Sequence, residues 1–181
     1  MDHRHNPPDH AKCGYTLTEL LITIALLALL LQTATPPLTR LLAAWQRDQV
    51  TRTLIDHLAL ARSAAVHGSR KVVVCSSVDG RSCAPASIRE WTSGWLVFQD
   101  LDDDNQFGAN DKLIALSQGA HGIRSVQGSA NVQRFVFLPT GMLAYGMSTL
   151  EIVPRIGETQ KIIVNRIGRV RLSRAEPEDG R

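Results

Sequence analysis

The feature that most constrains this sequence is an apolar stretch near the N-terminus with one charge at its start. Residues 20–31 contain no charged side chain, and extending the stretch back to Tyr15 adds only Glu19. Residues 15–31 reach the lower limit of a helix that crosses a bilayer, for which about 17–25 residues are needed. A carboxylate at the edge of lipid is costly unless it is neutralised, so Glu19 is a candidate functional residue.

Three interpretations of this N-terminus follow. A secretory signal peptide would be cleaved at the small residues Thr33-Ala34-Thr35. A plain membrane anchor would keep the stretch in the bilayer, with the polar residues 1–14 as a cytoplasmic leader. In the third, Glu19 neutralises the free N-terminal amine of a neighbouring chain, and the stretch becomes an assembly helix.

Helical periodicity continues beyond the apolar stretch. Apolar residues recur three or four apart over residues 38–65, and Gly68 is a natural helix end. Pro36 and Pro37 lack a backbone N–H, so we expect them to bend or locally melt the helix. The sequence therefore predicts one long helix over residues 15–67, with its second half packed on a domain.

Strand signals follow Gly68. Runs rich in β-branched and aromatic residues, separated by turn residues, predict six strands. Their ranges are 71–77, 95–99, 132–138, 149–153, 161–165 and 169–172. The polar residues 175–181 are expected to form a flexible tail.

The residues at the start of the apolar stretch resemble the processing site of type IV prepilins and type II secretion pseudopilins. Gly14-Tyr15-Thr16-Leu17-Thr18-Glu19 has that family's order of a glycine, an aromatic residue, a hydroxyl–leucine pair and a glutamate, with Tyr15 where Phe is usual. The resemblance implies cleavage after Gly14 by a prepilin peptidase and methylation of the new N-terminus at Tyr15. It also implies that Glu19 is the assembly carboxylate.

The same resemblance implies a domain organisation and a location. Residues 1–14 are the leader, 15–37 the transmembrane and assembly helix, and 38–174 a globular domain made of helix 38–67 and sheet 71–174. The chain passes once through the bacterial inner membrane, with this domain in the periplasm, and is extractable into a pilus or pseudopilus. The implied partners are other pilins or pseudopilins, the prepilin peptidase and inner-membrane lipid.

A second group of residues is similar to the FimT/GspH branch of the pseudopilins. The group contains Val74-Cys75-Ser76-Ser77, Cys83, Trp91, Gly94-Trp95-Leu96-Val97-Phe98 and an acidic loop. This resemblance implies a pilin-like α+β fold, in which the long N-terminal helix packs on antiparallel β-sheet. It also implies a minor tip component of a type II secretion pseudopilus or of a type IV pilus.

Cys75 and Cys83 are the two cysteines left once the leader, which contains Cys13, is removed. An even pair in an exported domain favours a disulfide that closes a short loop. Two free thiols are the alternative. A metal site is disfavoured because neither residue has a Cys or His at ligand spacing.

The acidic loop, residues 100–111, contains five aspartates. Four of them have a spacing close to that of a calcium loop: Asp100, Asp102, Asp104 and Asp111. The pattern is incomplete, because position 6 is Asn105 instead of Gly and the last ligand is Asp instead of Glu. The alternative is a solvated turn rich in Asp–backbone hydrogen bonds. We expect no cofactor.

Positive charge gathers in the C-terminal part of the chain. Residues 112–174 contain nine Lys or Arg and two Glu, a net charge of +7, whereas the whole chain carries only +3. If residues 169–172 form a strand, Arg169 and Arg171 point the same way, and Val170 and Leu172 point into the sheet. Two arginines about 6.6 Å apart match the spacing of backbone phosphates in a nucleic acid.

The sequence Gly168-Arg169-Val170-Arg171 also resembles the Gly-Arg-x-Arg motif of FimT proteins that bind DNA during natural transformation. The resemblance implies that Arg169 and Arg171 contact double-stranded DNA. Arg166, Arg174 and Lys161 widen the basic patch. The alternative function is a purely structural GspH-like tip component for type II protein secretion, whose arginines form a solvated or partner-binding face.

Enzymatic activity is not expected. Ser76 and Ser77 have no His close in the sequence, and the histidines after the leader are His57, His67 and His121. No glycine-rich phosphate-binding loop accompanies them.

Overall fold

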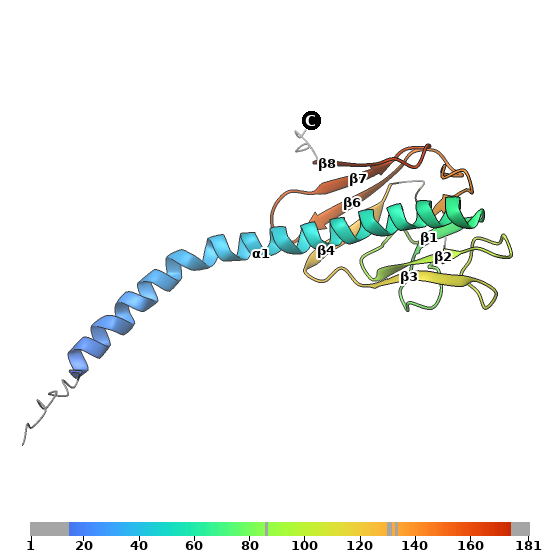
Figure 1. The fold of residues 1–181 in the computed structure, drawn as a ribbon. Helices are drawn as coiled ribbons and strands as arrows, with labels where there is room; N and C mark the ends of the chain where they lie inside the picture. Colours follow the sequence, from blue (N-terminus) through green and yellow to red (C-terminus); the bar gives the residue numbers. More distant parts are fainter. Residues whose placement is uncertain (1–14, 86, 130–131, 133, 175–181) are drawn as a thin grey trace, which may run out of the picture. The chain divides into compact units, whose positions relative to one another are not determined.

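The computed structural model describes residues 15–85, 87–129, 132 and 134–174, with the side chains of residues 32–37 excepted. The predicted leader, with its cleavage residue Gly14, and the predicted tail lie outside these residues. The described chain forms one helix followed by eight strands (Figure 1). These elements are α1 (Leu17–Gly68), β1 (Val72–Ser76), β2 (Gly94–Gln99), β3 (Lys112–Gln118), β4 (Ile123–Gly128), β5 (Arg134–Phe137), β6 (Ser148–Pro154), β7 (Gln160–Val164) and β8 (Val170–Arg174).

Helix α1 begins directly after Thr16, whose side-chain oxygen accepts a hydrogen bond from the backbone N–H of Glu19 at 3.2 Å. This is the arrangement of a helix N-cap, and an acidic residue in the first turn further stabilises a helix. The helical backbone continues through residues 36–37. Of the two predicted effects of the prolines, a bend or local melting, the continuous helix excludes local melting of the backbone.

The chain divides into two compact units, residues 1–39 and 40–181. In the first unit, the large apolar side chains of residues 20–31 are exposed. Within the residues that the structure describes, no helix is both long enough and apolar enough to cross a membrane. The predicted membrane span over residues 15–37 is therefore not confirmed.

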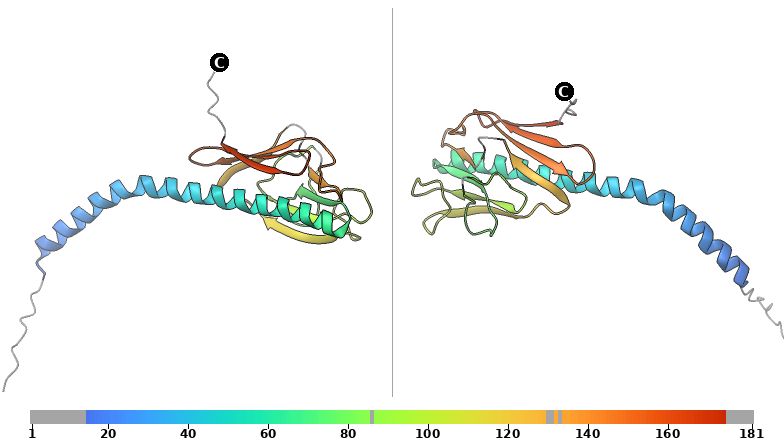
Figure 2. Two further views of the ribbon diagram at one scale, coloured as in Figure 1. Left: turned by 45° about the horizontal axis from the view of Figure 1, so that its top comes forward. Right: turned by 180° about the vertical axis from the view of Figure 1, so that it is seen from behind.

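In the second unit, α1 packs on two antiparallel sheets (Figure 1). The strand orders are β3-β2-β1-β5 in one sheet and β4-β6-β7-β8 in the other, so β8 is an edge strand (Figure 2). The predicted α+β class, a long helix packed on antiparallel sheet, is confirmed.

One face of α1 enters the core at helical spacing. Leu54, Leu58, Ala61 and Ala65 are completely buried. They join a single apolar cluster with side chains from both sheets, among them Val72, Val74, Leu150, Ile152 and Ile162. Burial of this apolar area stabilises the domain by about 25 cal/mol per Å². Because both sheets contribute to the cluster, α1 holds the positions of both.

The predicted strands correspond to six of the eight observed, with ends that differ by at most two residues. The sequence does not predict β3 or β4. β3 is an edge strand whose side chains are mostly exposed, so its sequence has no buried alternation. β4 is buried only at Ile123 and Val126, and polar residues separate them.

A hydrogen bond between two rings joins α1 to β2. Trp95 Nε1 donates to His57 Nδ1 at 2.9 Å, and the rings meet edge-on. Only a neutral imidazole with its proton on Nε2 offers Nδ1 as an acceptor. Burial lowers the pKa of His57, and the nearby Asp56 carboxylate opposes this in part.

We expect the free energy of unfolding to fall as the pH decreases below about 6.5, the ordinary pKa of His in an unfolded chain. Because the folded-state pKa of His57 is lowered, the unfolded chain takes up this proton first, and stability declines until the pH reaches that lowered value. Urea unfolding between pH 5.5 and pH 7.5 measures the trend. His57→Gln should flatten it, and the control His121→Gln, at an exposed position, should not. Equal pH dependence in the parent and His57→Gln would contradict the assignment.

Candidate functional site

The arginine motif begins in the turn between β7 and β8. The backbone N–H of Gly168 donates to the carbonyl of Asn165 at 2.9 Å. The N–H of Arg169 donates to the side-chain oxygen of Asn165 at 2.8 Å. Two bonds to one residue hold the backbone that presents the motif.

Gly168 is required here for its conformation and for its surroundings. Its φ is +76°, in the left-handed region that favours glycine. A Cβ atom at this position would lie 2.3 Å from the carbonyl oxygen of Gly141 and 3.0 Å from Nε of Arg62. The glycine of the motif therefore lets the turn contact both the preceding loop and α1.

The arginines lie at the exposed edge of the second sheet. Arg169 is in the turn, one residue before β8 begins, whereas Arg171 is in β8 opposite Ile163. The predicted patch residues Arg166 and Arg174 are exposed as well. Within the part of the chain that the structure describes, these four guanidinium groups form no hydrogen bond or ion pair.

Val170 pairs with Val164 of β7, and Leu172 pairs with Ile162. Both β7 residues belong to the core, so the register agrees with the predicted inward face of β8. Val170 is partly buried against the core, but Leu172 is 52% exposed. An edge strand has a neighbouring strand on one flank only, so alternation along it does not ensure burial. An apolar side chain is therefore exposed at the edge of the sheet, on the face of β8 opposite to that of Arg171.

Lys161 differs from the arginines because it already has a partner. Its Nζ atom lies 2.8 Å from Oε1 of Glu151, the residue opposite it on β6. The Glu151 carboxylate offsets the positive charge of Lys161, so Lys161 adds less positive charge to the basic patch than predicted.

A groove separates α1 from the start of β8, with a volume of about 440 Å³. Arg62, Ser63 and His67 of α1 line it opposite Arg169. Arg62 is held in place by a hydrogen bond from Nε to the carbonyl of Gly141 at 3.2 Å. Arg62 and His67 are not predicted as site residues, because no local motif connects a helix residue with a turn about 100 residues later.

In the acidic loop, aspartate carboxylates accept hydrogen bonds from the backbone N–H groups of the same loop. The Asp100 carboxylate is buried and accepts the N–H groups of Asp103 and Asn105. The Asp111 carboxylate accepts the N–H groups of Leu101 and Gly108. These contacts are those of the predicted alternative, an Asp-rich turn.

Lys71 supplies positive charge to this loop. Its Nζ atom lies 2.9 Å from Oδ1 of Asp103 and 3.6 Å from Oδ2 of Asp100. The hydrogen bond to Asp103 raises the pKa of Lys71. Carboxylate oxygens of Asp100, Asp102 and Asp104 lie within 4.8 Å of one another, but the fourth predicted calcium ligand, Asp111, is not in this group.

Cys75 and Cys83 form a disulfide with their Cα atoms 5.6 Å apart. The bond closes the loop after β1, in which Asp79 accepts the N–H groups of Arg81 and Ser82. These hydrogen bonds lower the pKa of Asp79 to about 2. The loop is therefore ordered by a covalent bond and by an ionised side chain.

Replacing both cysteines by alanine is expected to lower the free energy of unfolding by about 2–3 kcal/mol. The disulfide joins residues eight positions apart, and a loop of that length restricts the unfolded chain by this amount in the chain-entropy model. Urea unfolding of the double variant measures the loss. The parent protein in excess reductant should lose a similar amount, and unchanged stability in both experiments would contradict the prediction.

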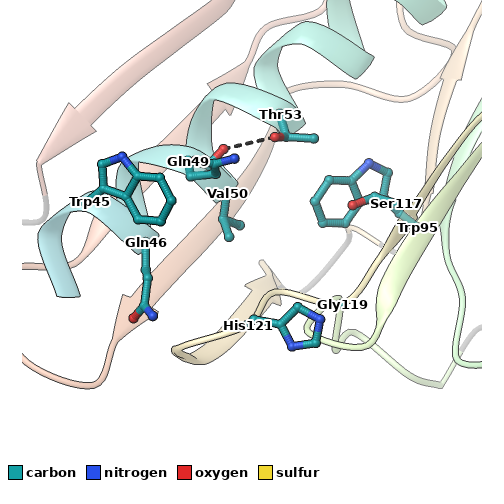
Figure 3. A pocket seen from close by; sticks show the side chains of 9 residues that line it. All are labelled: Trp45, Gln46, Gln49, Val50, Thr53, Trp95, Ser117, Gly119 and His121. Atoms are coloured by element: carbon teal, nitrogen blue, oxygen red, sulfur yellow. Dashed lines mark hydrogen bonds between the residues drawn. The ribbon is translucent and has the colours of Figure 1, made fainter. Parts of the chain in front are cut away.

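A second cavity, of about 310 Å³, lies between α1 and the strands β2 and β3 (Figure 3). Its lining contains two tryptophans, Trp45 and Trp95, together with polar side chains such as Gln46, Gln49 and His121. Thr53 donates a hydrogen bond to the carbonyl of Gln49. None of the binding residues predicted from the sequence lines this cavity.

The serines near β1 have structural contacts. Ser76 and Ser77 are buried, and Ser77 Oγ donates to the carbonyl of Ser82 at 2.6 Å. On α1, Ser63 Oγ is 3.4 Å from His67 Nδ1, which is closer to the Ser63 carbonyl oxygen, at 2.8 Å. The imidazole therefore pairs with the backbone and does not activate the hydroxyl.

Comparisons with known proteins agree with this fold. Residues 50–168 match the protein family described as type II transport protein GspH, and residues 9–31 match the prokaryotic N-terminal methylation motif. A search of curated proteins found no match.

Two similar solved structures come from pilus and secretion systems. One is the type IV minor pilin FimU of Pseudomonas aeruginosa PAO1, with 16% identity and a TM-score of 0.54, covering 76% of this chain and 92% of that chain. The other is the minor pseudopilin EpsH from the type 2 secretion system of Vibrio cholerae, with 17% identity and a TM-score of 0.50, covering 71% and 97%. At such identities the likeness concerns the fold alone.

Proposed function

Because this chain belongs to the family of the type II transport protein GspH, we propose that it is a minor pilin or pseudopilin that binds DNA through the arginines around Gly168. The binding residues are Arg169 and Arg171, with Arg166 and Arg174 beside them. Lys161 has a lesser part because of its ion pair with Glu151. The activity suits DNA uptake in natural transformation.

The observation that carries this proposal is a group of four exposed guanidinium groups on one turn and edge strand. The planar guanidinium group of arginine can bind a phosphate through two parallel hydrogen bonds. A charge that only keeps the surface solvated does not need this geometry. With so few contacts, binding is expected to be moderate, independent of sequence and strongly salt-dependent.

Fluorescence anisotropy with a short labelled DNA duplex tests the proposal, using the full chain in a non-ionic detergent. Two to four phosphate contacts predict a slope of roughly −2 to −4 in a plot of log K against log salt. Absence of binding at low salt, or binding that salt does not weaken, would overturn DNA binding.

The N-terminal part is proposed to build the subunit into a filament. Cleavage after Gly14 frees the amine of Tyr15, which is methylated, and Glu19 neutralises the corresponding amine of a neighbouring subunit. The match to the methylation motif and the place of Glu19 in the first turn of α1 support this role. Residues 15–37 then anchor the chain in the inner membrane, with the globular domain in the periplasm.

Mass spectrometry of the exported chain tests this maturation. The expected first residue is Tyr15, carrying one added methyl group. A chain that begins at another residue, for example after the small residues at 33–35, would indicate a conventional signal peptide.

A second candidate function is a structural tip component for type II protein secretion without DNA binding. It is favoured by the exposed Leu172 at the edge of the sheet, which suits a protein partner better than a phosphate backbone. Neither function needs a catalytic group, and we expect no hydrolase activity from the purified protein.

A further inference from the structure

We propose that the groove between α1 and the start of β8 takes an unpaired base of single-stranded DNA. This inference rests on the proposed DNA-binding function and specifies the form of DNA that the site prefers. The base enters the groove, and the phosphates on either side of it bind the arginines of the turn and of β8.

The groove suits a base. Four of the residues that line it have apolar side chains: Ile55, Ala59, Val66 and Val170. In a duplex the bases are stacked and paired, so a duplex presents phosphates to the arginines and leaves an apolar groove unfilled. A single strand can turn a base outward, and proteins that bind single strands commonly give such a base an apolar or stacking surface.

The lining of the groove also includes planar guanidinium and imidazole groups. Arg62 and His67 of α1 lie on one side, and Arg169 lies on the other. Guanidinium and imidazole planes both stack on nucleobases. The hydrogen bond from Arg62 Nε to the Gly141 carbonyl holds this guanidinium group next to the turn.

The groove is also continuous with the phosphate-binding arginines. Gly168 and Arg169 line it, and Arg171 follows two residues later on β8. A strand of DNA with a base in the groove therefore has guanidinium groups within one or two nucleotides of it. The cavity next to His121 has no arginine in its lining and lacks this combination (Figure 3).

Three probes of equal length separate contacts to bases from contacts to phosphates: a single strand, an abasic single strand and a blunt duplex. With the full chain in a non-ionic detergent, we expect the single strand to bind about 10-fold more tightly than the abasic strand, as for one stacked base. Ala59→Leu fills the groove without changing charge. It should remove the preference and leave duplex affinity unchanged.

Leu60→Phe is the matched control, because Leu60 is exposed next to Ala59 but does not line the groove. It should keep the preference. If Ala59→Leu unfolds, as judged by circular dichroism, Ser63→Leu provides a second way to fill the groove. Equal affinity for the single and abasic strands, with arginine-dependent duplex binding, would overturn the groove and leave DNA binding intact. No binding to any probe at low salt would overturn the proposed function and this inference together.

Discussion

Replacing Arg169 and Arg171 together by alanine is expected to weaken DNA binding on the order of 100-fold at low salt. Hydrogen bonds to a charged group contribute about 1.5–3 kcal/mol each, so the loss of one such bond at each exposed arginine, at the lower end of that range, corresponds to about 3 kcal/mol or two orders of magnitude. The salt dependence should also become shallower, by about one unit of slope for each phosphate contact removed. Fluorescence anisotropy over a salt series measures both effects.

The matched control removes two exposed arginines elsewhere. Arg89 and Arg124 are exposed near β4, at the opposite edge of the sheet from β8. Their double alanine variant loses the same net charge and should bind DNA almost as the parent does. If both double variants lose the same affinity, the general charge of the domain is responsible and the motif is not.

Replacing Gly168 by alanine is expected to reduce both stability and DNA binding while keeping every arginine. The left-handed backbone costs about 1–2 kcal/mol for a residue with a side chain. The added Cβ would lie 2.3 Å from the Gly141 carbonyl oxygen, so the turn must also shift. We expect a total loss of about 3 kcal/mol or more, in the range of strained backbone substitutions, with a displaced Arg169.

Gly157 offers a control for this substitution. It too has a positive φ, +105°, but a Cβ there meets no atom within 4 Å. Gly157→Ala should therefore show the conformational cost without the contact, and should leave DNA binding unchanged. Urea unfolding and anisotropy compare the two variants, and equal losses would show that the contact with Gly141 and Arg62 is unimportant.

The elements that the sequence predicts best are those with one strong pattern. The second half of α1 repeats apolar residues at helical spacing, and from residue 54 on most of them are buried: Leu54, Leu58, Ala61 and Ala65. The first residues of the repeat are exposed: Leu38, Leu41, Leu42 and Trp45. β1 is fully buried, and its continuous apolar run identifies it as a strand. β3 escapes prediction because its stability depends on pairing with β2, a contact distant in sequence, and not on its own pattern.

In the candidate site too, residues of a local motif are predictable from the sequence, and residues brought together only by the fold are not. Arg169 and Arg171 belong to a short local motif, and so does the pair Cys75 and Cys83. The groove with Arg62 depends on α1 and the β7–β8 turn meeting in space, which no local pattern encodes. Alternation alone predicts the inward face of Leu172, which lies opposite the buried Ile162, but it does not predict that Leu172 stays exposed because β8 lies at an edge.

Arg62 has a consequence for how the subunit would respond to its neighbours. The same helix that buries Leu54 and Leu58 in the core carries Arg62, which contacts the Gly141 carbonyl and the Gly168 turn. A neighbouring subunit that twists α1 by a few degrees would therefore change the width of the groove between α1 and the start of β8 without contacting the arginines. Capture of a ligand at the turn and mechanical strain in the helix would then act on each other in both directions.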